Sequence, residues 1–155
     1  MKKVAISACL MGKKCRYDAT DNHDVRLLGK LENFELIPFC PEGYAFGSPR
    51  PTMDLIETPQ GIKAISNLTG GDLSPPVENY ARNFFDTYDD IDLYIGKDRS
   101  PSCGVCSARL YDEEKRLLSV EAVGLRSQEA KRRGIESWDA EVYLDDRAKK
   151  SGYIG

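Results

Sequence analysis

The sequence contains a single histidine, His23, among its 155 residues. A zinc site with two histidine ligands, or the histidine pair of a metalloprotease, therefore cannot be built. A Ser-His-Asp or Cys-His arrangement would have to use His23. That residue stands in the polar segment 20–24, which is typical of a turn followed by a helix cap. We expect His23 to be an exposed residue of this cap without a chemical role.

Long apolar segments are also missing from the chain. No run approaches the roughly 20 residues that cross a bilayer, and no signal-peptide pattern follows Met1. Hydrophobic residues make up 41% of the sequence and charged residues 30%, a mix typical of globular proteins. We expect one domain over residues 1–155, located in the cytoplasm, with no membrane partner.

There is no excess of positive charge. The 22 basic and 25 acidic residues give a net charge of −3. A domain that binds nucleic acid through phosphate neutralisation alone is expected to be basic. The composition therefore argues against nucleic acid as the main partner, and the basic run at 131–133 is expected to be a solvated helix face.

Apolar runs that read as strands alternate with helical patterns along the chain. Residues 54–58 and 62–66 predict a hairpin with its turn at 59–61. We expect further strands at 3–9, 34–40, 91–95, 108–111 and near 141–144, and helices at 25–31, from 74 onward and at 124–133. Such alternation favours a single α/β domain with a largely parallel, Rossmann-like sheet, to which the hairpin is a small insertion or edge.

Two local features refine this prediction. Pro38 lies within the run 34–40, where a central strand would lose a ladder hydrogen bond. Ser74 precedes Pro75 and Pro76, so we expect its side chain to cap the helix that follows. An apolar face continues along that helix to Tyr88 and is expected to be core.

Three of the five cysteines stand where predicted strands end. Cys9 ends the first apolar run, Cys40 ends the second, and Cys103 lies in the loop after 91–95. The carboxyl ends of parallel strands share one edge of a sheet, where ligands bind. The sequence therefore predicts that these three thiols converge at that edge.

Several kinds of thiol site are compatible with this pattern. A structural zinc site needs four ligands, usually in two close pairs, and only Cys103 and Cys106 have that spacing. A redox dithiol of this spacing normally begins a helix, whereas residues 107–111 read as extended. An iron–sulfur cluster is the other thiolate-rich choice, and with three cysteine ligands it leaves one iron open to a substrate. Inert core thiols remain the simplest alternative.

The neighbours of these cysteines suit sulfur chemistry. Glu42 places a carboxylate two residues after Cys40, and Ser100 precedes Cys103 in the same loop. Thiolates and anionic clusters also need nearby donors and cations. Four cations lie in the same predicted loops: Arg16, Arg50, Lys97 and Arg99.

Four segments occur in an order that resembles a known family. They are SACLMGKKCRYD at 7–18, CPE at 40–42, GSPRP at 47–51 and SPSCG at 100–104. Together they are similar to the small bacterial and archaeal thiouracil desulfidase domain, and the resemblance covers nearly the whole chain. Two departures are Ala19, where the family usually has glycine, and the additional Cys106.

The resemblance implies an oxygen-labile [4Fe-4S] cluster held by Cys9, Cys40 and Cys103. It implies a hydrolytic, non-redox desulfidase that replaces the sulfur of a thiolated pyrimidine such as 2-thiouracil with oxygen and releases hydrosulfide. By motif, Glu42 matches the carboxylate that activates water or moves protons, and Ser100 matches the assisting serine. Cys15 is the second choice as a cluster ligand.

Two other functions stay open at the level of sequence. One is a carrier of a metal, a cluster or sulfur without hydrolysis, which would need neither Glu42 nor Ser100. The other is an α/β binding domain with inert thiols. For an enzyme, the negative charge and the absence of residues for a second domain favour a free thiolated base or nucleoside over thiolated tRNA. Cys106 is expected to be a buried or half-buried structural residue.

Overall fold

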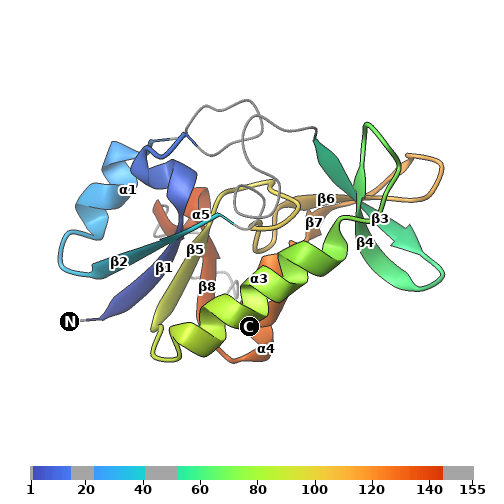
Figure 1. The fold of residues 1–155 in the computed structure, drawn as a ribbon. Helices are drawn as coiled ribbons and strands as arrows, with labels where there is room; N and C mark the ends of the chain where they lie inside the picture. Colours follow the sequence, from blue (N-terminus) through green and yellow to red (C-terminus); the bar gives the residue numbers. More distant parts are fainter. Residues whose placement is uncertain (1, 15–22, 41–51, 145–155) are drawn as a thin grey trace.

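The computed structural model describes residues 2–14, 23–40 and 52–144. It contains two four-stranded sheets with helices packed around them, as Figure 1 shows. The strand order is β2-β1-β5-β8 in the first sheet and β4-β3-β6-β7 in the second. None of the helices in the described ranges is long and apolar enough to cross a membrane. The two sheets and the helices around them confirm the predicted α/β class.

The first sheet is entirely parallel, as the sequence predicts. Its strands are β2 (Glu35–Phe39), β1 (Lys3–Ser7), β5 (Leu93–Gly96) and β8 (Glu136–Asp139). Strand β2 lies at an edge, beside β1 only. Pro38 is tolerated there because an edge strand does not need every N–H group for a ladder.

Helices cover both faces of this parallel sheet (Figure 1). Alternate residues of β1 point to opposite faces, so Val4 and Ile6 pack in one core and Ala5 in another. The first core includes residues of α1 and α5, and the second includes residues of α3 and α4. The helices are α1 (Val25–Lys30), α3 (Ser74–Thr87), α4 (Leu125–Arg132) and α5 (Ala140–Leu144).

The predicted hairpin forms, but it is more than an insertion. It pairs in parallel with β6, and β7 then adds to β6 in the antiparallel direction. The strands of this mixed sheet are β4 (Gly61–Ser66), β3 (Met53–Thr58), β6 (Ala108–Tyr111) and β7 (Leu117–Ala122). The expectation of one main sheet with a small hairpin insertion is therefore corrected to two sheets of equal strand number.

Helix α3 joins the two sheets. Val77, near its start, packs in the core of the mixed sheet, while Phe84 and Phe85, near its end, pack against the parallel sheet. The predicted cap role of Ser74 is wrong, since Ser74 is itself the first helical residue. Its Oγ instead accepts a hydrogen bond of 2.7 Å from the amide of Ala64 in β4, which ties the helix to the second sheet.

Two expectations near the C-terminal part of the fold are wrong. Residues 140–144 form helix α5, and the strand lies just before it at β8. The amide of Glu141 donates to the Asp98 carboxylate over 3.0 Å, so a distant side chain satisfies the start of this helix. Strand β7 is not among the predicted strands, since its large apolar residues Leu117, Leu118 and Val120 are exposed and give no pattern of a buried face.

The first strand is shorter than predicted. Strand β1 ends at Ser7, and Ala8–Met11 form a 3₁₀ turn, η1, that contains Cys9. Gly12 ends this turn with a φ of 93°, a left-handed conformation that glycine adopts without strain. The predicted exposure of His23 is confirmed, and the neighbouring Asp24 caps α1 by accepting from the amide of Leu27.

Gly96 offers a test of how tightly the loop after β5 packs against that strand. A Cβ atom at Gly96 would lie 1.8 Å from the carbonyl oxygen of Cys103, a backbone atom that cannot give way cheaply. We expect Gly96→Ala to lower the free energy of unfolding by about 1–3 kcal/mol or more, the range for overpacked cores. Urea unfolding measures this change.

The matched control is Gly29→Ala in α1. A Cβ atom at Gly29 meets nothing within 4 Å, and alanine is the better helix former. This variant is expected to be at least as stable as the original protein. Equal stability of Gly96→Ala and the original protein would contradict the close approach of Cys103 to β5.

Candidate functional site

Three cysteines follow three adjacent strands of the parallel sheet. Cys9 lies in the turn after β1, Cys40 directly follows β2, and Cys103 lies in the loop after β5. The strands are neighbours in the order β2-β1-β5, and all run in the same direction. The three positions therefore lie at the carboxyl edge of the sheet, as the sequence predicts.

Two of these thiols are close enough to interact. The charge of Cys40 raises the pKa of the Cys103 thiol, and the Ser7 hydroxyl at the end of β1 lowers it. Cys9 packs in the core on the opposite face of the sheet from Cys103. Within residues 2–14, 23–40 and 52–144, no group of three His, Cys, Asp or Glu side chains is close enough to hold one metal ion.

The loop that contains Cys103 satisfies the start of helix α4. The first turn of a helix has N–H groups without partners inside the helix. Here the carbonyl of Pro101 accepts from the amide of Leu125, and the carbonyl of Ser102 accepts from the amide of Arg126. Gly124 allows this contact, because a Cβ atom there would lie 2.6 Å from the carbonyl carbon of Ser102. Helix α4 and the loop therefore fix each other.

Two buried hydroxyl groups hold the carbonyl of Cys103. It accepts a hydrogen bond of 2.8 Å from Ser127 Oγ and a longer one of 3.4 Å from Tyr94 Oη. The hydroxyls of Tyr94 and Ser127 are 2.9 Å apart, and both residues are buried. A strand and a helix thus position the backbone of Cys103 together.

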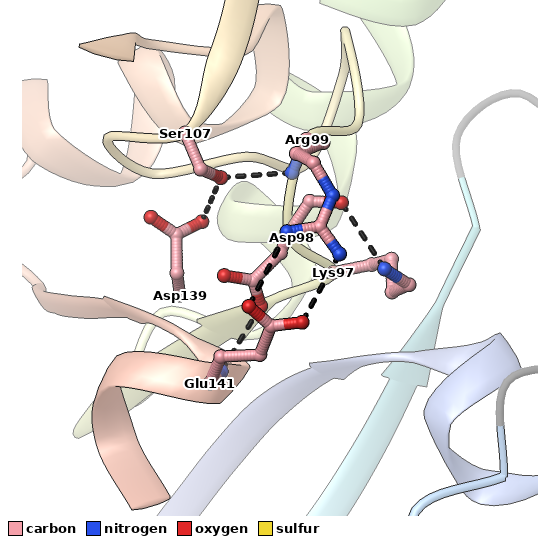
Figure 2. Close-up of polar contacts among 6 residues, drawn as sticks. All are labelled: Lys97, Asp98, Arg99, Ser107, Asp139 and Glu141. Atoms are coloured by element: carbon pink, nitrogen blue, oxygen red, sulfur yellow. Dashed lines mark hydrogen bonds and ion pairs between the residues drawn. The ribbon is translucent and has the colours of Figure 1, made fainter. Parts of the chain in front are cut away.

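The far end of the loop is anchored by Asp139, at the end of β8. Its carboxylate accepts from the amides of Val105 and Cys106 over 2.7 and 2.8 Å, and from the Ser107 hydroxyl over 2.7 Å. Ser107 in turn accepts from the amide of Arg99, as Figure 2 shows. Because Asp139 is 1% exposed, water cannot replace these bonds.

A second set of contacts connects the cysteine loop to helix α5. The Arg99 guanidinium binds both carboxylate oxygens of Glu141, at 3.0 and 3.3 Å (Figure 2). Asp98 accepts from the Glu141 amide, and burial raises the pKa of Asp98 above its usual range. Lys97 Nζ donates to the carbonyl of Asp98. The predicted cations Lys97 and Arg99 therefore hold the loop itself.

Ser100 organises the segment before Cys103. Its Oγ accepts from the amides of Ser102 and Cys103 over 3.3 and 3.0 Å. The hydroxyls of Ser100 and Ser102 are 3.2 Å apart, and Ser102 Oγ is 3.5 Å from Cys103 Sγ. Since two amides occupy the acceptor side of Ser100, its proton is free to donate to Ser102. A row of hydroxyl groups thus leads to the sulfur.

Burial dominates the electrostatics of Cys103. Loss of water around the sulfur raises the pKa of the Cys103 thiol to about 11, while the charge of Arg126 and the hydroxyls of Ser102 and Ser7 act in the opposite direction. The thiol is therefore protonated at neutral pH, and a metal that binds there displaces the proton. The cation that acts on this sulfur is Arg126, which sequence reasoning did not single out.

Of the remaining predicted site residues, only Cys106 lies in the part of the chain that the structure describes. Glu42, Cys15, Arg16 and Arg50 lie outside the described residues. Cys106 is half-buried, as expected, and its sulfur accepts from Lys131 Nζ over 3.4 Å.

Two residues that shape the site could not be singled out from the sequence: one anchors the cysteine loop, and the other brings a positive charge to it. Asp139 stands between the predicted helix at 124–133 and the strand predicted near 141–144, and Arg126 is a polar position in that predicted helix. Only the fold places one under the cysteine loop and the other among buried aromatic rings.

A family model described as 2-thiouracil desulfurase matches residues 4–141. The chain belongs to this family. The family description names 2-thiouracil, a small thiolated base.

A solved structure of TudS, described as a [4Fe-4S]-dependent thiouracil desulfidase, has the same fold as this family member. The two share 24% sequence identity with a TM-score of 0.71. The alignment covers 97% of this chain and 99% of the TudS chain. No curated protein sequence matches.

Asp139 provides a test of how the cysteine loop is anchored. Asp139→Asn replaces one acceptor oxygen with an amide group that faces an N–H or O–H donor. We expect the free energy of unfolding to fall by about 1–3 kcal/mol, the range for a buried group left without its partner. Glu141→Gln, in an exposed ion pair, is the control and is expected to cost no more than about 1 kcal/mol. Equal losses in the two variants, measured by urea unfolding, would contradict the anchoring role.

Proposed function

We propose that this member of the 2-thiouracil desulfurase family removes sulfur from a thiolated pyrimidine by hydrolysis and releases hydrosulfide. The observation that carries the proposal is the placement of Cys9, Cys40 and Cys103 after three adjacent parallel strands. The proposed cofactor is a [4Fe-4S] cluster, the group named for the structurally similar TudS.

The residues at this edge fit such a cluster by their chemistry. All three candidate ligands are reduced thiols, and Cys103 has hydroxyl donors and a guanidinium close to its sulfur. A cluster binds each thiolate through a different iron, so its ligands stand farther apart than those of one ion. Donors and cations near the sulfurs are the partners that orient and stabilise such ligands.

When bound, the cluster would supply a soft Lewis-acid iron that polarises a C–S bond. The protein residues would supply the rest. We assign the activation of water to the Glu42 carboxylate, as its motif implies, and the transfer of a proton to the row of hydroxyls from Ser100 to Ser102. The backbone bonds to Ser100 Oγ keep this row in place.

The substrate we favour is a free thiolated base or nucleoside rather than thiolated tRNA. The net charge of −3 gives little attraction to a phosphate backbone. The cytoplasm is the proposed location, since reducing conditions there keep cysteines as thiols. The deciding experiment is anaerobic reconstitution with iron and sulfide, followed by an assay of hydrosulfide release from 2-thiouracil, 4-thiouracil and thiolated tRNA.

Replacement of single cysteines tests the proposed ligand set. Cys9→Ser, Cys40→Ser and Cys103→Ser are each expected to lose most of the bound iron after anaerobic reconstitution, because two thiolates do not replace three around the cluster. Cys106→Ser is the control and is expected to retain the iron. Iron and sulfide analysis measures both. Loss of iron in Cys15→Ser together with retention in Cys40→Ser would show that the ligand set is wrong.

Glu42→Gln separates catalysis from cluster binding. The amide keeps the size of the side chain and removes the base, so we expect unchanged iron content and a rate lowered by about 10²–10⁴-fold, the usual range for general acid–base catalysis. Hydrosulfide release is compared at matched iron content. Glu57→Gln, on the exposed side of β3, is the control and is expected to keep full activity. Full activity in Glu42→Gln would remove Glu42 from the mechanism.

A further inference from the structure

Arg126 is an arginine with no exposed surface and, in the part of the chain that the structure describes, no acceptor for its charge. Its relative exposure is 0%, and none of its three side-chain nitrogens makes a hydrogen bond to the residues that the structure describes. The Tyr80 hydroxyl is close enough to favour the charged form, but its geometry is not that of a hydrogen bond. Burial lowers the Arg126 pKa from its usual value. A buried, unpaired cation costs free energy and calls for a specific reason.

Aromatic rings surround the guanidinium. Its Cζ lies 3.4 Å from the ring centroid of Phe39 and 4.2 Å from that of Phe84. Further rings stand at 5.2 to 5.8 Å: Tyr80, Phe85 and Tyr94. These faces attract a cation but accept few of its hydrogen bonds. The cage keeps Arg126 charged and leaves its N–H donors available to an anion.

The cage contacts chain segments that adjoin two of the candidate cluster ligands. Phe39, under the guanidinium, directly precedes Cys40, and the amide of Arg126 holds the carbonyl of Ser102, next to Cys103. Tyr80 Oη accepts from the amide of Cys40 over 3.4 Å. Arg126 and Cys103 also interact electrostatically. The positive charge of Arg126 therefore lies within electrostatic reach of the Cys103 sulfur, where the negative charge of a bound cluster would add to it.

We propose that Arg126 is the counter-charge of the sulfur site, where its guanidinium compensates the negative charge of thiolate and sulfide sulfur in the loaded protein. This inference rests on the proposed function, because only a bound anionic cluster supplies that charge. Arg126 is a positioning residue here. Its buried charge lowers the stability of the metal-free protein and stabilises the protein that holds the cluster.

The test compares Arg126→Met and Arg126→Lys with the original protein. Methionine fills the cage without a charge, and replacement of a buried charge by an apolar group of similar size is often neutral or stabilising. We expect the melting temperature of metal-free Arg126→Met to equal or exceed that of the original protein. After anaerobic reconstitution with iron and sulfide, we expect its iron retention against a chelator to fall by about 10–100-fold, the range for residues that support metal ligands.

Arg126→Lys restores the charge and is expected to recover part of the iron retention. The matched control is Arg133→Met, since Arg133 also lies over the Phe85 ring but is paired with Asp86 and Glu129. It is expected to retain iron as the original protein does.

Each other outcome overturns the inference in a distinguishable way. A clear fall in the melting temperature of metal-free Arg126→Met would make Arg126 a structural residue. Normal iron retention in Arg126→Met, or no recovery in Arg126→Lys, would show that the charge does not matter. Failure of the original protein itself to take up iron and sulfide would remove the proposed function, and with it this role for Arg126.

Discussion

The site depends on the hydrogen bonds between the cysteine loop and the first turn of helix α4. The carbonyls of Pro101 and Ser102 satisfy amides that a helix cannot satisfy by itself, in a helix that has no side-chain cap. The same contact brings the N-terminal part of α4 onto the carboxyl edge of the parallel sheet. Gly96 and Gly124 are required on the two sides of the loop because backbone atoms leave no room for a Cβ. Position and rigidity of Cys103 follow from this packing.

Charge at this edge follows from the same packing. Because Arg126 is the second residue of α4, the bond from its amide to Ser102 commits its side chain to the core between α3, α4 and the parallel sheet. Three of the aromatic rings in this core, Tyr80, Phe84 and Phe85, belong to the apolar helix face that the sequence predicts as core. They also form the surroundings of a buried cation, so that packing and electrostatics at the site are not separable.

Much of the fold could be predicted from local patterns. Three of the four parallel strands, the hairpin and the three main helices form near their predicted positions, because apolar periodicity reports which face of an element is buried. The prediction failed where long-range contacts decide. Residues 140–144 form a helix whose first turn binds the Asp98 carboxylate, the Ser74 hydroxyl accepts from β4, and β7 joins β6 while its large apolar side chains stay exposed. None of these partners is near in sequence.

The sequence by itself determined the chemistry of this protein: one histidine, a set of thiols at strand ends, and family motifs that surround them. These properties are local, since they depend on residue type and on neighbours a few positions away. Only the tertiary structure decided that the hairpin belongs to a second sheet, that Asp139 anchors the cysteine loop, and that Arg126 is enclosed beside the sulfurs. Each of these is set by contacts between segments far apart in the chain, which no local pattern encodes.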